Sequence, residues 1–319
     1  MARSELCASV LDTIGDTPLV ELSRITRDLD GQVFAKLEFL NPGYSKKDRI
    51  ARQMIEEAEA SGALQPGDTV VELTSGNTGA GLAIVCAAKG YRFVAVMSRG
   101  NSVERVRMMR ALGTEVVLVD QCPHSTPGAV SGADLARVEE TAREIVRERA
   151  AFRADQFQLE GNSRAHYRHT APEIMRQSGG IDAFCDFVGS GGSFAGCAQY
   201  FKECDPAIRC YVVEPEGAAA LAGEAVSRPN HRIQGGGYAM PDLALVDRAL
   251  IDGYLRVSDA DATCMTRRLA KEEGLFAGFS SGANLAAALQ LLAGAHRGGR
   301  VAILLCDSGL KYLSTDLWC

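Results

Sequence analysis

Two adjacent lysines, Lys46 and Lys47, lie between a turn and a segment whose apolar residues have helical spacing. Pro42 and Gly43 end the preceding apolar run, and Ser45 is placed to cap the helix that follows. A lysine in the first turn of a helix lies at the positive end of the helix dipole, which disfavours its protonated form. Such an amine can serve as a covalent nucleophile. On this segment alone, two solvated charges at a helix start are the commoner arrangement.

Residues 74–79 form a second polar cluster, between a strand-like and a helix-like segment. They read Thr-Ser-Gly-Asn-Thr-Gly. The glycines let the backbone approach a ligand, the side chains supply hydrogen-bond donors, and a helix N-terminus favours an anion. The same residues can equally be an ordinary helix cap. The pattern alone leaves both interpretations open.

A third cluster is rich in glycine and separates an apolar strand-like run from another helix-like segment. It consists of Gly189, Ser190, Gly191, Gly192 and Ser193. A strand, a glycine-rich turn and a helix together can cradle a phosphate with backbone N–H groups. The spacing matches neither a P-loop nor the dinucleotide fingerprint GxGxxG. Ser280 precedes a helix-like segment in the same way.

The elements that must position these residues alternate along the chain. Strands are predicted at 33–40, 69–73, 93–97, 115–119, 183–188, 209–213 and 301–305. Helices are predicted at 50–60, 77–88, 102–112, 134–149, 193–204, 259–273 and 282–293. This alternation predicts an α/β fold with mostly parallel sheets flanked by helices, and ligands at the carboxyl ends of the strands. Residues 121–132 and 223–242 are expected to be surface loops.

Composition narrows the function classes. The 319 residues are 46% hydrophobic and carry a formal net charge of −6, which argues against a nucleic-acid partner. No apolar run is long enough to span a bilayer and the N-terminus does not read as a secretory signal, so we expect a cytoplasmic protein without a membrane partner. The ten cysteines lack zinc-ligand spacing, and we expect free, structural thiols and no metal site.

Residues 41–49, Asn-Pro-Gly-Tyr-Ser-Lys-Lys-Asp-Arg, resemble the lysine motif of the cysteine synthase and cystathionine β-synthase family. The resemblance extends from Ile14 to Thr315, with the motifs in family order. It implies a two-domain, fold type II (tryptophan synthase β-like) enzyme with pyridoxal 5'-phosphate as cofactor. It also implies a small mobile substrate-binding domain at 36–149, a large cofactor-phosphate-binding domain at 1–35 and 150–319, an active site between them, and a homodimer.

The resemblance assigns roles residue by residue. Lys47 is the catalytic Schiff-base lysine, Asn77 contacts the cofactor's phenolic oxygen, and Ser280 faces the pyridine nitrogen. A neutral hydroxyl there favours elimination at Cβ over transamination. The phosphate is bound by Gly189, Ser190, Gly191, Gly192 and Ser193. The substrate is bound by Thr74, Ser75, Thr78 and Gln156 at its carboxylate, and by Gly236 and Tyr238 of a closing loop.

Several positions depart from the family pattern. Lys46 stands where an aliphatic residue is usual, and Lys311 where an arginine is common. Residues 158–162 and the closing loop 234–242 also differ, so the second substrate could differ too. Asp242 and Glu160 lie in these altered loops, and they are speculative candidates for activating water.

The resemblance implies a β-replacement on a serine- or cysteine-type amino acid through an aminoacrylate. A cysteine synthase-like reaction, which joins activated serine and sulfide, is the first expectation. The alternative is an L-cysteine desulfhydrase or β-lyase that releases hydrogen sulfide by elimination or water addition. A cystathionine-forming, diaminopropionate-forming or other specialised β-substituted alanine synthase and a non-catalytic binding homologue remain further alternatives.

Overall fold

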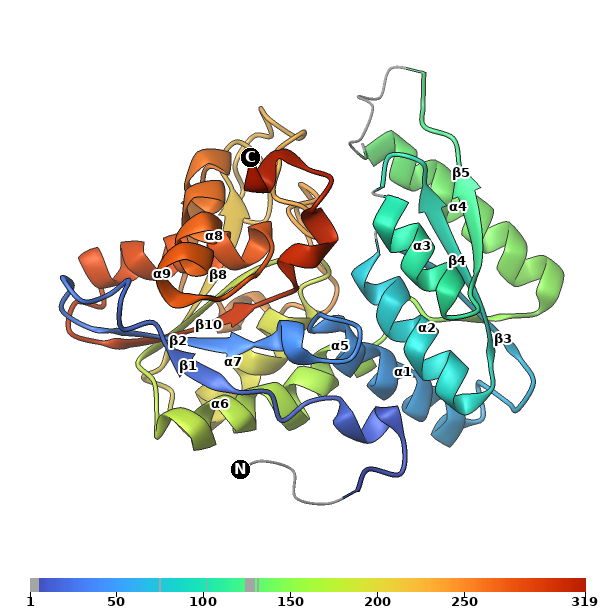
Figure 1. Cartoon of the computed structure of the whole chain (residues 1–319), viewed down its shortest axis with the longest axis horizontal. Helices are drawn as coiled ribbons and strands as arrows, with labels where there is room; N and C mark the ends of the chain where they lie inside the picture. The colour runs from blue at the N-terminus through green and yellow to red at the C-terminus, as the bar shows by residue number, and fades with distance from the viewer. Residues whose placement is uncertain (1–5, 75, 102, 124–129, 131) are drawn as a thin grey trace.

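The computed structural model describes residues 6–74, 76–101, 103–123, 130 and 132–319, and it contains two sheets that lie side by side (Figure 1). The six-stranded sheet has the order β1 (Leu19–Glu21), β2 (Gln32–Leu37), β10 (Arg300–Leu305), β7 (Ala183–Phe187), β8 (Arg209–Pro215) and β9 (Gly253–Val257). Only β1 in this sheet pairs antiparallel, with β2. The four-stranded sheet has the order β5 (Glu115–Val119), β4 (Arg92–Ser98), β3 (Thr69–Leu73) and β6 (Phe152–Arg153), and all its strands are parallel.

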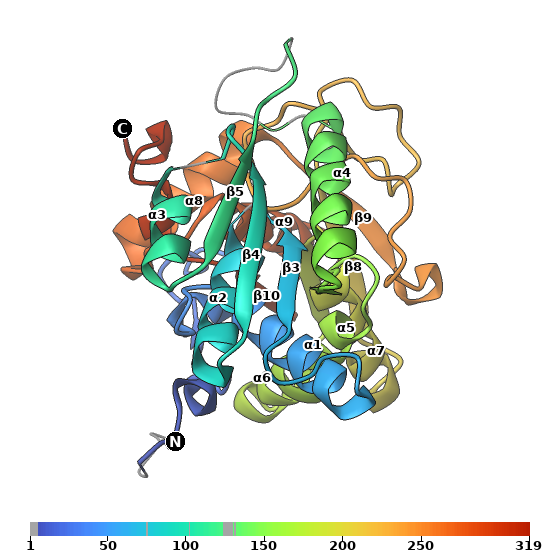
Figure 2. The same ribbon diagram turned by 90° about the vertical axis from the view of Figure 1, so that its right-hand side faces the viewer.

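Helices cover both faces of each sheet because successive strand residues point to opposite sides. In the four-stranded sheet, Val70 packs against α1 (Lys47–Ser61), α2 (Asn77–Lys89) and α3 (Val103–Ala111). The next residue, Val71, packs against α4 (Gly132–Arg149), and Figure 2 shows α4 and α2 on opposite sides of β3 and β4. Both faces of these strands are therefore buried.

The six-stranded sheet follows the same rule. Cys185 and Ile303 face α8 (Asp259–Glu273) and α9 (Phe279–Ala293). Phe184 and Ala302 face α6 (Ala171–Ser178) and α7 (Gly192–Cys204). Short elements complete the chain: α5 (Gly161–Ala165), a π-helical turn η3 (His166–Thr170), and the 3₁₀ turns η1 (Val10–Thr13), η2 (Glu38–Leu40), η4 (Arg248–Leu250), η5 (Gly309–Tyr312) and η6 (Asp316–Trp318).

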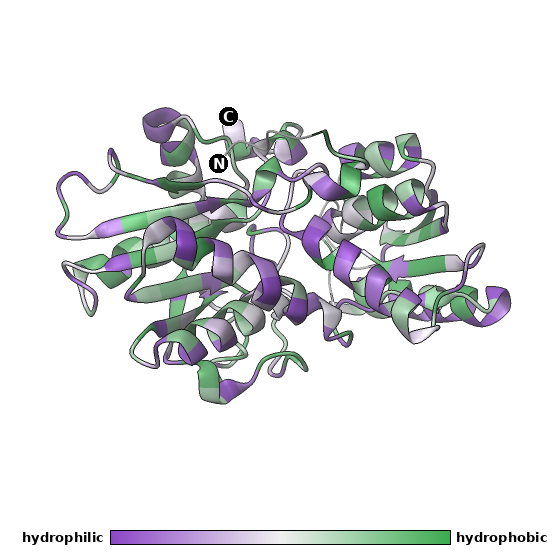
Figure 3. Ribbon diagram, turned by 90° about the horizontal axis from the view of Figure 1, so that it is seen from below, coloured by the Kyte–Doolittle hydropathy of each residue, from purple (hydrophilic) through white to green (hydrophobic). Residues whose placement is uncertain are grey.

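The hydropathy colouring agrees with this layering. Hydrophobic residues follow the strands of both sheets, while hydrophilic residues gather on the outer faces of the helices and in the connections (Figure 3). Among the described residues, no helix combines the length and the apolar character needed to cross a membrane.

The predicted α/β fold is confirmed, and three predicted elements, the strands 69–73 and 115–119 and the helix 259–273, have the observed bounds. Some details are wrong. The strand predicted to run to residue 40 ends at Leu37 and continues as η2, while the helix predicted from residue 50 begins at Lys47, with Lys46 as its N-cap. Ser45 is therefore not the N-cap, although its Oγ accepts the N–H of Lys47 at 3.3 Å. The helical stretch 161–178 and the strands β1, β6 and β9 are additions to the prediction.

The expected division of the chain into two domains can be compared with the two sheets. β2 crosses residue 36 and belongs to the six-stranded sheet, while β6 lies beyond residue 149 and belongs to the four-stranded sheet. The division into a small and a large domain stays a prediction. The expected loop at 121–132 lies mostly outside the described residues.

Candidate active site

The carboxyl ends of β2, β7 and β10 meet at one edge of the large sheet because these strands are parallel. The lysine pair follows β2, and its backbone is tied to β10 where the N–H of Lys46 donates to the carbonyl of Cys306 at 2.9 Å. The glycine-rich cluster 189–193 follows β7. The fold therefore brings together two motifs that lie more than a hundred residues apart, at the carboxyl edge of the sheet, where ligands of open parallel sheets bind.

Lys47 and Lys46 have different surroundings. Lys47 is half-buried at the start of α1, and its Nζ lies 3.5 Å from the Oγ of Ser190. Burial, followed by the positive charge of Lys46, lowers the pKa of Lys47 to about 8. Part of the amine is therefore neutral near pH 7, and the neutral form is the one that a nucleophile or a general base needs.

Lys46 is buried, so the arrangement of two solvated charges is wrong for this pair. Its ammonium pairs with Asp186 of β7, at 3.1 and 3.0 Å from the two carboxylate oxygens. Burial alone would lower the pKa of Lys46, but the Asp186 carboxylate beside it raises that pKa above its usual value. Lys46 therefore stays protonated, whereas its neighbour Lys47 is partly neutral.

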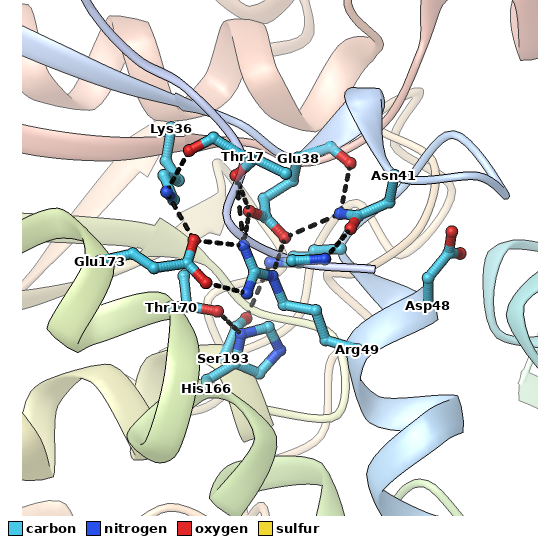
Figure 4. A network of polar contacts seen from close by, with 12 residues as sticks. Thr17, Lys36, Glu38, Asn41, Asp48, Arg49, His166, Thr170, Glu173 and Ser193 are labelled. Carbon is cyan, nitrogen blue, oxygen red and sulfur yellow. Dashed lines mark hydrogen bonds and ion pairs between the residues drawn. The ribbon is translucent and has the colours of Figure 1, made fainter. Parts of the chain in front are cut away.

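A network of buried charges fixes the segment that carries the lysines. Arg49 lies two residues after Lys47 and makes paired hydrogen bonds with Glu38 at 2.7 and 2.8 Å and with Glu173 at 2.7 and 2.8 Å. Lys36 completes the cluster, 2.6 Å from Glu173 (Figure 4). The guanidinium thus holds the start of α1 against η2 and α6, which restricts where the Lys47 side chain can lie.

The glycine-rich cluster has the geometry of an anion cradle. Gly191 has φ +82°, in the region that favours glycine, and a Cβ on Gly192 would lie 2.1 Å from Oδ1 of Asn162. The thirteen-residue helix α7 begins at Gly192, so its free N–H groups point toward the loop. Ser190 is held by Asn162, whose Nδ2 donates to the serine Oγ at 2.9 Å. These residues fit a phosphate group.

The residues expected to bind the substrate carboxylate lie after the carboxyl ends of β3 and β6, and Thr74, Thr78 and Gln156 are not in the lining of the cavity described below. The Oγ1 of Thr74 accepts the N–H groups of Gly76 at 3.0 Å and Gly79 at 2.8 Å, so it caps α2 and keeps its own proton for a ligand. Cap and ligand site are therefore compatible. Thr78 donates to Oε1 of Gln156 at 2.7 Å, which places these two expected residues side by side. Ser75 lies outside the described residues.

Asn77 is oriented from both sides. Its Nδ2 donates to Asp307 at 2.7 Å, and its Oδ1 accepts from Lys311 Nζ at 2.7 Å. Burial lowers the pKa of Lys311 to about 8, against the opposing effect of the Asp307 carboxylate. The second amide hydrogen of Asn77 remains available for a ligand oxygen. Lys311, at the position where an arginine is common, thus acts on an expected cofactor contact.

One cavity connects the expected cofactor residues. Its lining includes both lysines and Asn77, together with Ser280 at the start of α9. The full lining is Lys46, Lys47, Asn77, Phe187, Gly189, Ser190, Gly191, Ser193, Gly235, Ser280 and Cys306. None of these lining residues, within the described part of the chain, is an aspartate or glutamate. The groups present therefore fit pyridoxal phosphate: an amine, a phosphate cradle and a neutral hydroxyl.

The closing loop lies against this cavity. A Cβ on Gly236 would approach the carbonyl oxygen of Val188 to 2.5 Å, and the N–H of Gly237 donates to that carbonyl at 2.8 Å. The ring of Tyr238 packs edge-on against the ring of Phe157, with 6.1 Å between the ring centroids. The loop thus joins the glycine-rich cluster to the segment that bears Gln156, although Gly236 and Tyr238 are not in the cavity lining.

The structure does not bring the two speculative acids into the cavity. Glu160 is exposed and pairs with Arg164. Asp242 is also exposed, and neither residue belongs to the cavity lining. Sequence reasoning missed other residues of the site, namely Asp186, Asn162, Cys306 and the role of Lys46. A carboxylate inside the apolar run 183–188 was the available signal, because a buried charge requires a partner.

Comparison with known proteins agrees with the geometry. A family model described as "Pyridoxal-phosphate dependent enzyme" matches residues 10–307. Cysteine synthase 3 of Caenorhabditis elegans is 41% identical to this chain, over 100% of this chain and 92% of the relative.

Two solved structures extend the comparison. An O-ureido-L-serine synthase shares 40% identity with a TM-score of 0.89, and the match covers 98% of this chain and 96% of that chain. A hydrogen sulfide-producing enzyme from Fusobacterium nucleatum shares 39% identity with a TM-score of 0.89, over 98% of this chain and 99% of that chain. This chain therefore belongs to the fold type II pyridoxal-phosphate dependent enzymes, in the cysteine synthase and cystathionine β-synthase family, and its cofactor is pyridoxal phosphate.

Proposed function

We propose that this enzyme catalyses a β-replacement that joins an activated serine and sulfide to form cysteine. The observation that carries the proposal is the single cavity in which Lys47 lies beside the phosphate cradle, with Asn77 and the neutral Ser280 in the same lining. The 41% identity to a cysteine synthase over the whole chain supports the same reaction class. Lys47 would hold the cofactor covalently, residues 189–193 its phosphate, Asn77 its phenolic oxygen and Ser280 its pyridine nitrogen.

The bound cofactor supplies an electron sink that makes the α-hydrogen of an amino acid acidic. In this proposal Lys47, once released from the cofactor, moves that proton through its Nζ. A pKa of about 8 suits this task, because the amine can accept the proton near neutral pH and hold it for a later return. The neutral Ser280, with no carboxylate among the described residues that line the cavity, favours loss of the β-substituent over transamination.

The substrate carboxylate is assigned to Thr74, Ser75, Thr78 and Gln156. Gln156 is fixed on both sides, since its Oε1 accepts from Thr78 at 2.7 Å and its Nε2 lies 3.3 Å from Glu72 Oε1. Burial raises the pKa of Glu72 to about 8, although Arg153 opposes the shift. In this proposal the carboxylate binds where β3 and β6 end, at described residues that are not part of the cavity lining. Tyr238 and Gly236 would close over the bound amino acid.

The test is product analysis with the purified holoenzyme, given O-acetylserine plus sulfide, serine plus sulfide, or cysteine alone. We expect cysteine to form from O-acetylserine and sulfide, and the cofactor's visible absorbance to change when O-acetylserine alone is added. A matched Lys47→Ala variant should form no product. Fast sulfide release from cysteine, with no cysteine formed from O-acetylserine, would contradict the proposal.

A second candidate is a cysteine desulfhydrase. It is supported by the similar Fusobacterium enzyme, which is described as hydrogen sulfide-producing, and by the altered closing loop 234–242. Sulfide release from cysteine alone identifies it in the same experiment. Water activation by Asp242 or Glu160 belongs to this candidate. A homodimer and a cytoplasmic location remain predictions; the mass of the holoenzyme in solution tests the first.

A further inference from the structure

A charged pair lies beneath the phosphate cradle. Asp186 is in β7, between β8 and β10, and its side chain is fully buried. A buried carboxylate is stable only when its oxygens are paired. Lys46 bonds both oxygens, Ser193 donates to Oδ2 at 2.5 Å, and Asn284 donates to Oδ1 at 3.1 Å.

The lysine of this pair faces the cavity, whereas the aspartate does not. Lys46 and Ser193 both line the cavity, and Asp186 is absent from its lining. The side chain of Lys46 is 9% exposed and that of Asp186 is 0% exposed. The Lys46 ammonium is also 2.8 Å from the Oγ of Ser193, the last residue of the phosphate cradle. The positive charge is therefore at the cradle, and its counter-charge lies behind it.

This position matters because a phosphate monoester carries between about 1.5 and 2 negative charges near pH 7. The cradle of Gly189, Ser190, Gly191, Gly192 and Ser193 otherwise offers only neutral hydroxyls, backbone N–H groups and the partial charge of the α7 N-terminus. We propose that the Lys46 ammonium, oriented by Asp186, is a cationic ligand of the cofactor's phosphate and contacts the phosphate beside Ser193. The inference rests on the cofactor and is independent of the proposed substrates.

A purely structural pair would behave differently. If Lys46 served only to neutralise Asp186, replacing both charges together by neutral side chains of similar size would leave cofactor binding intact. If Lys46 binds the phosphate, the same replacement weakens pyridoxal phosphate but not pyridoxal, which lacks the phosphate. The neutral-pair variant Lys46→Met/Asp186→Asn therefore separates the two roles. It also avoids the unpaired buried carboxylate that Lys46→Met alone would leave.

The experiment is equilibrium dialysis of the full chain against graded pyridoxal phosphate and, separately, graded pyridoxal, with inorganic phosphate as a competitor. For the neutral-pair variant we expect the Kd of pyridoxal phosphate to rise about tenfold to a hundredfold, as for the loss of one charge-assisted hydrogen bond. The Kd of pyridoxal should change by less than about twofold. Inorganic phosphate should weaken the binding of pyridoxal phosphate to the wild type and should have no such effect on the variant.

Two further variants complete the design. Asp186→Asn removes the carboxylate that orients Lys46 and favours its charged form, so its preference for pyridoxal phosphate over pyridoxal should fall below that of the wild type. Lys271→Met, at an exposed position of α8, is the matched loss of a lysine and should bind both compounds as the wild type does. The proposal is overturned if the neutral-pair variant retains wild-type preference, or if it loses pyridoxal and pyridoxal phosphate equally. Far-UV circular dichroism checks the fold of each variant.

Discussion

Replacing Arg49 by methionine should destabilise this protein more than any ordinary surface change. Arg49 is 3% exposed and holds Glu38 and Glu173 through four hydrogen bonds of 2.7 to 2.8 Å. Methionine has similar length but no donor, so the perturbation removes charge with little change in volume. The replacement site is two residues from Lys47, in the turn that starts α1.

The magnitude follows from the charge balance of the cluster. Lys36 and Arg49 balance Glu38 and Glu173, and Arg49→Met leaves one buried negative charge uncompensated. Breaking a buried ion pair by removing one partner costs about 3–5 kcal/mol. We therefore expect a loss of about 3–5 kcal/mol in the free energy of unfolding. The loss exceeds that of a solvent-exposed pair because water cannot replace the missing guanidinium.

Urea unfolding followed by circular dichroism measures the difference in the free energy of unfolding between variant and wild type, provided that both proteins have the same dependence of that free energy on urea concentration. Both proteins should be compared at the same excess of cofactor, because cofactor binding itself stabilises the folded state. Arg52→Met is the matched control: Arg52 lies on the same helix, is 36% exposed and pairs with Glu56. It should cost at most about 1 kcal/mol.

The pH dependence provides a second signature. Burial raises the pKa of Glu38, but Arg49 and the other partners lower it below its ordinary value of 4.5 overall. Its contribution to stability is therefore present above that value and is lost as the pH falls through the lower, folded-state pKa. In Arg49→Met the carboxyl can protonate at higher pH, so the gap to the wild type should narrow on acidification. An Arg49→Met cost no larger than that of Arg52→Met, or a gap that widens in acid, would refute the reasoning.

Three other outcomes are expected. Because burial and Lys46 lower the pKa of Lys47 to about 8, the rate at which the cofactor-free enzyme binds pyridoxal phosphate covalently should rise with pH and level off above about 8. In Lys46→Met the midpoint of this pH profile should lie at higher pH. Stopped-flow absorbance measures the profile, and a midpoint that is unchanged or lower in the variant would contradict the prediction. Thr78→Val and Gln156→Ala should each raise KM for the amino acid about tenfold to a hundredfold, while the visible absorbance of the bound cofactor persists. Steady-state kinetics and an absorbance spectrum test this together. Loss of the cofactor band would instead assign these residues to cofactor binding. Glu160→Gln and Asp242→Asn should release sulfide from cysteine at the wild-type rate, since both acids are exposed and outside the cavity lining. A large fall in that rate in either variant would support a role of that acid in activating water.

Local sequence determined the scaffold and the motifs. The alternation of short apolar runs with segments of period 3.6 determines the α/β fold, because the former favour strands buried on both faces and the latter favour helices. Gly189, Gly191 and Gly192 mark a tight turn in the sequence, but the atoms that crowd Gly191 and Gly192, from Val246 and Asn162, come from distant residues. The assignments of Lys47, Asn77 and Ser280 came from motif resemblance, and the structure places all three in one cavity.

Only the tertiary structure decided which charges meet. Lys46 and Asp186 are 140 residues apart in the sequence, and their pairing depends on β2 and β7 ending at the same sheet edge on either side of β10. The same holds for Lys311, which reaches Asn77 across 234 residues. Local periodicity carries no information about such pairs, whereas the energy of a buried charge depends entirely on the partner that folding brings to it. That dependence is why Lys46, which looked like a surface lysine in the sequence, is a buried cation beside the glycine-rich cluster in the folded chain.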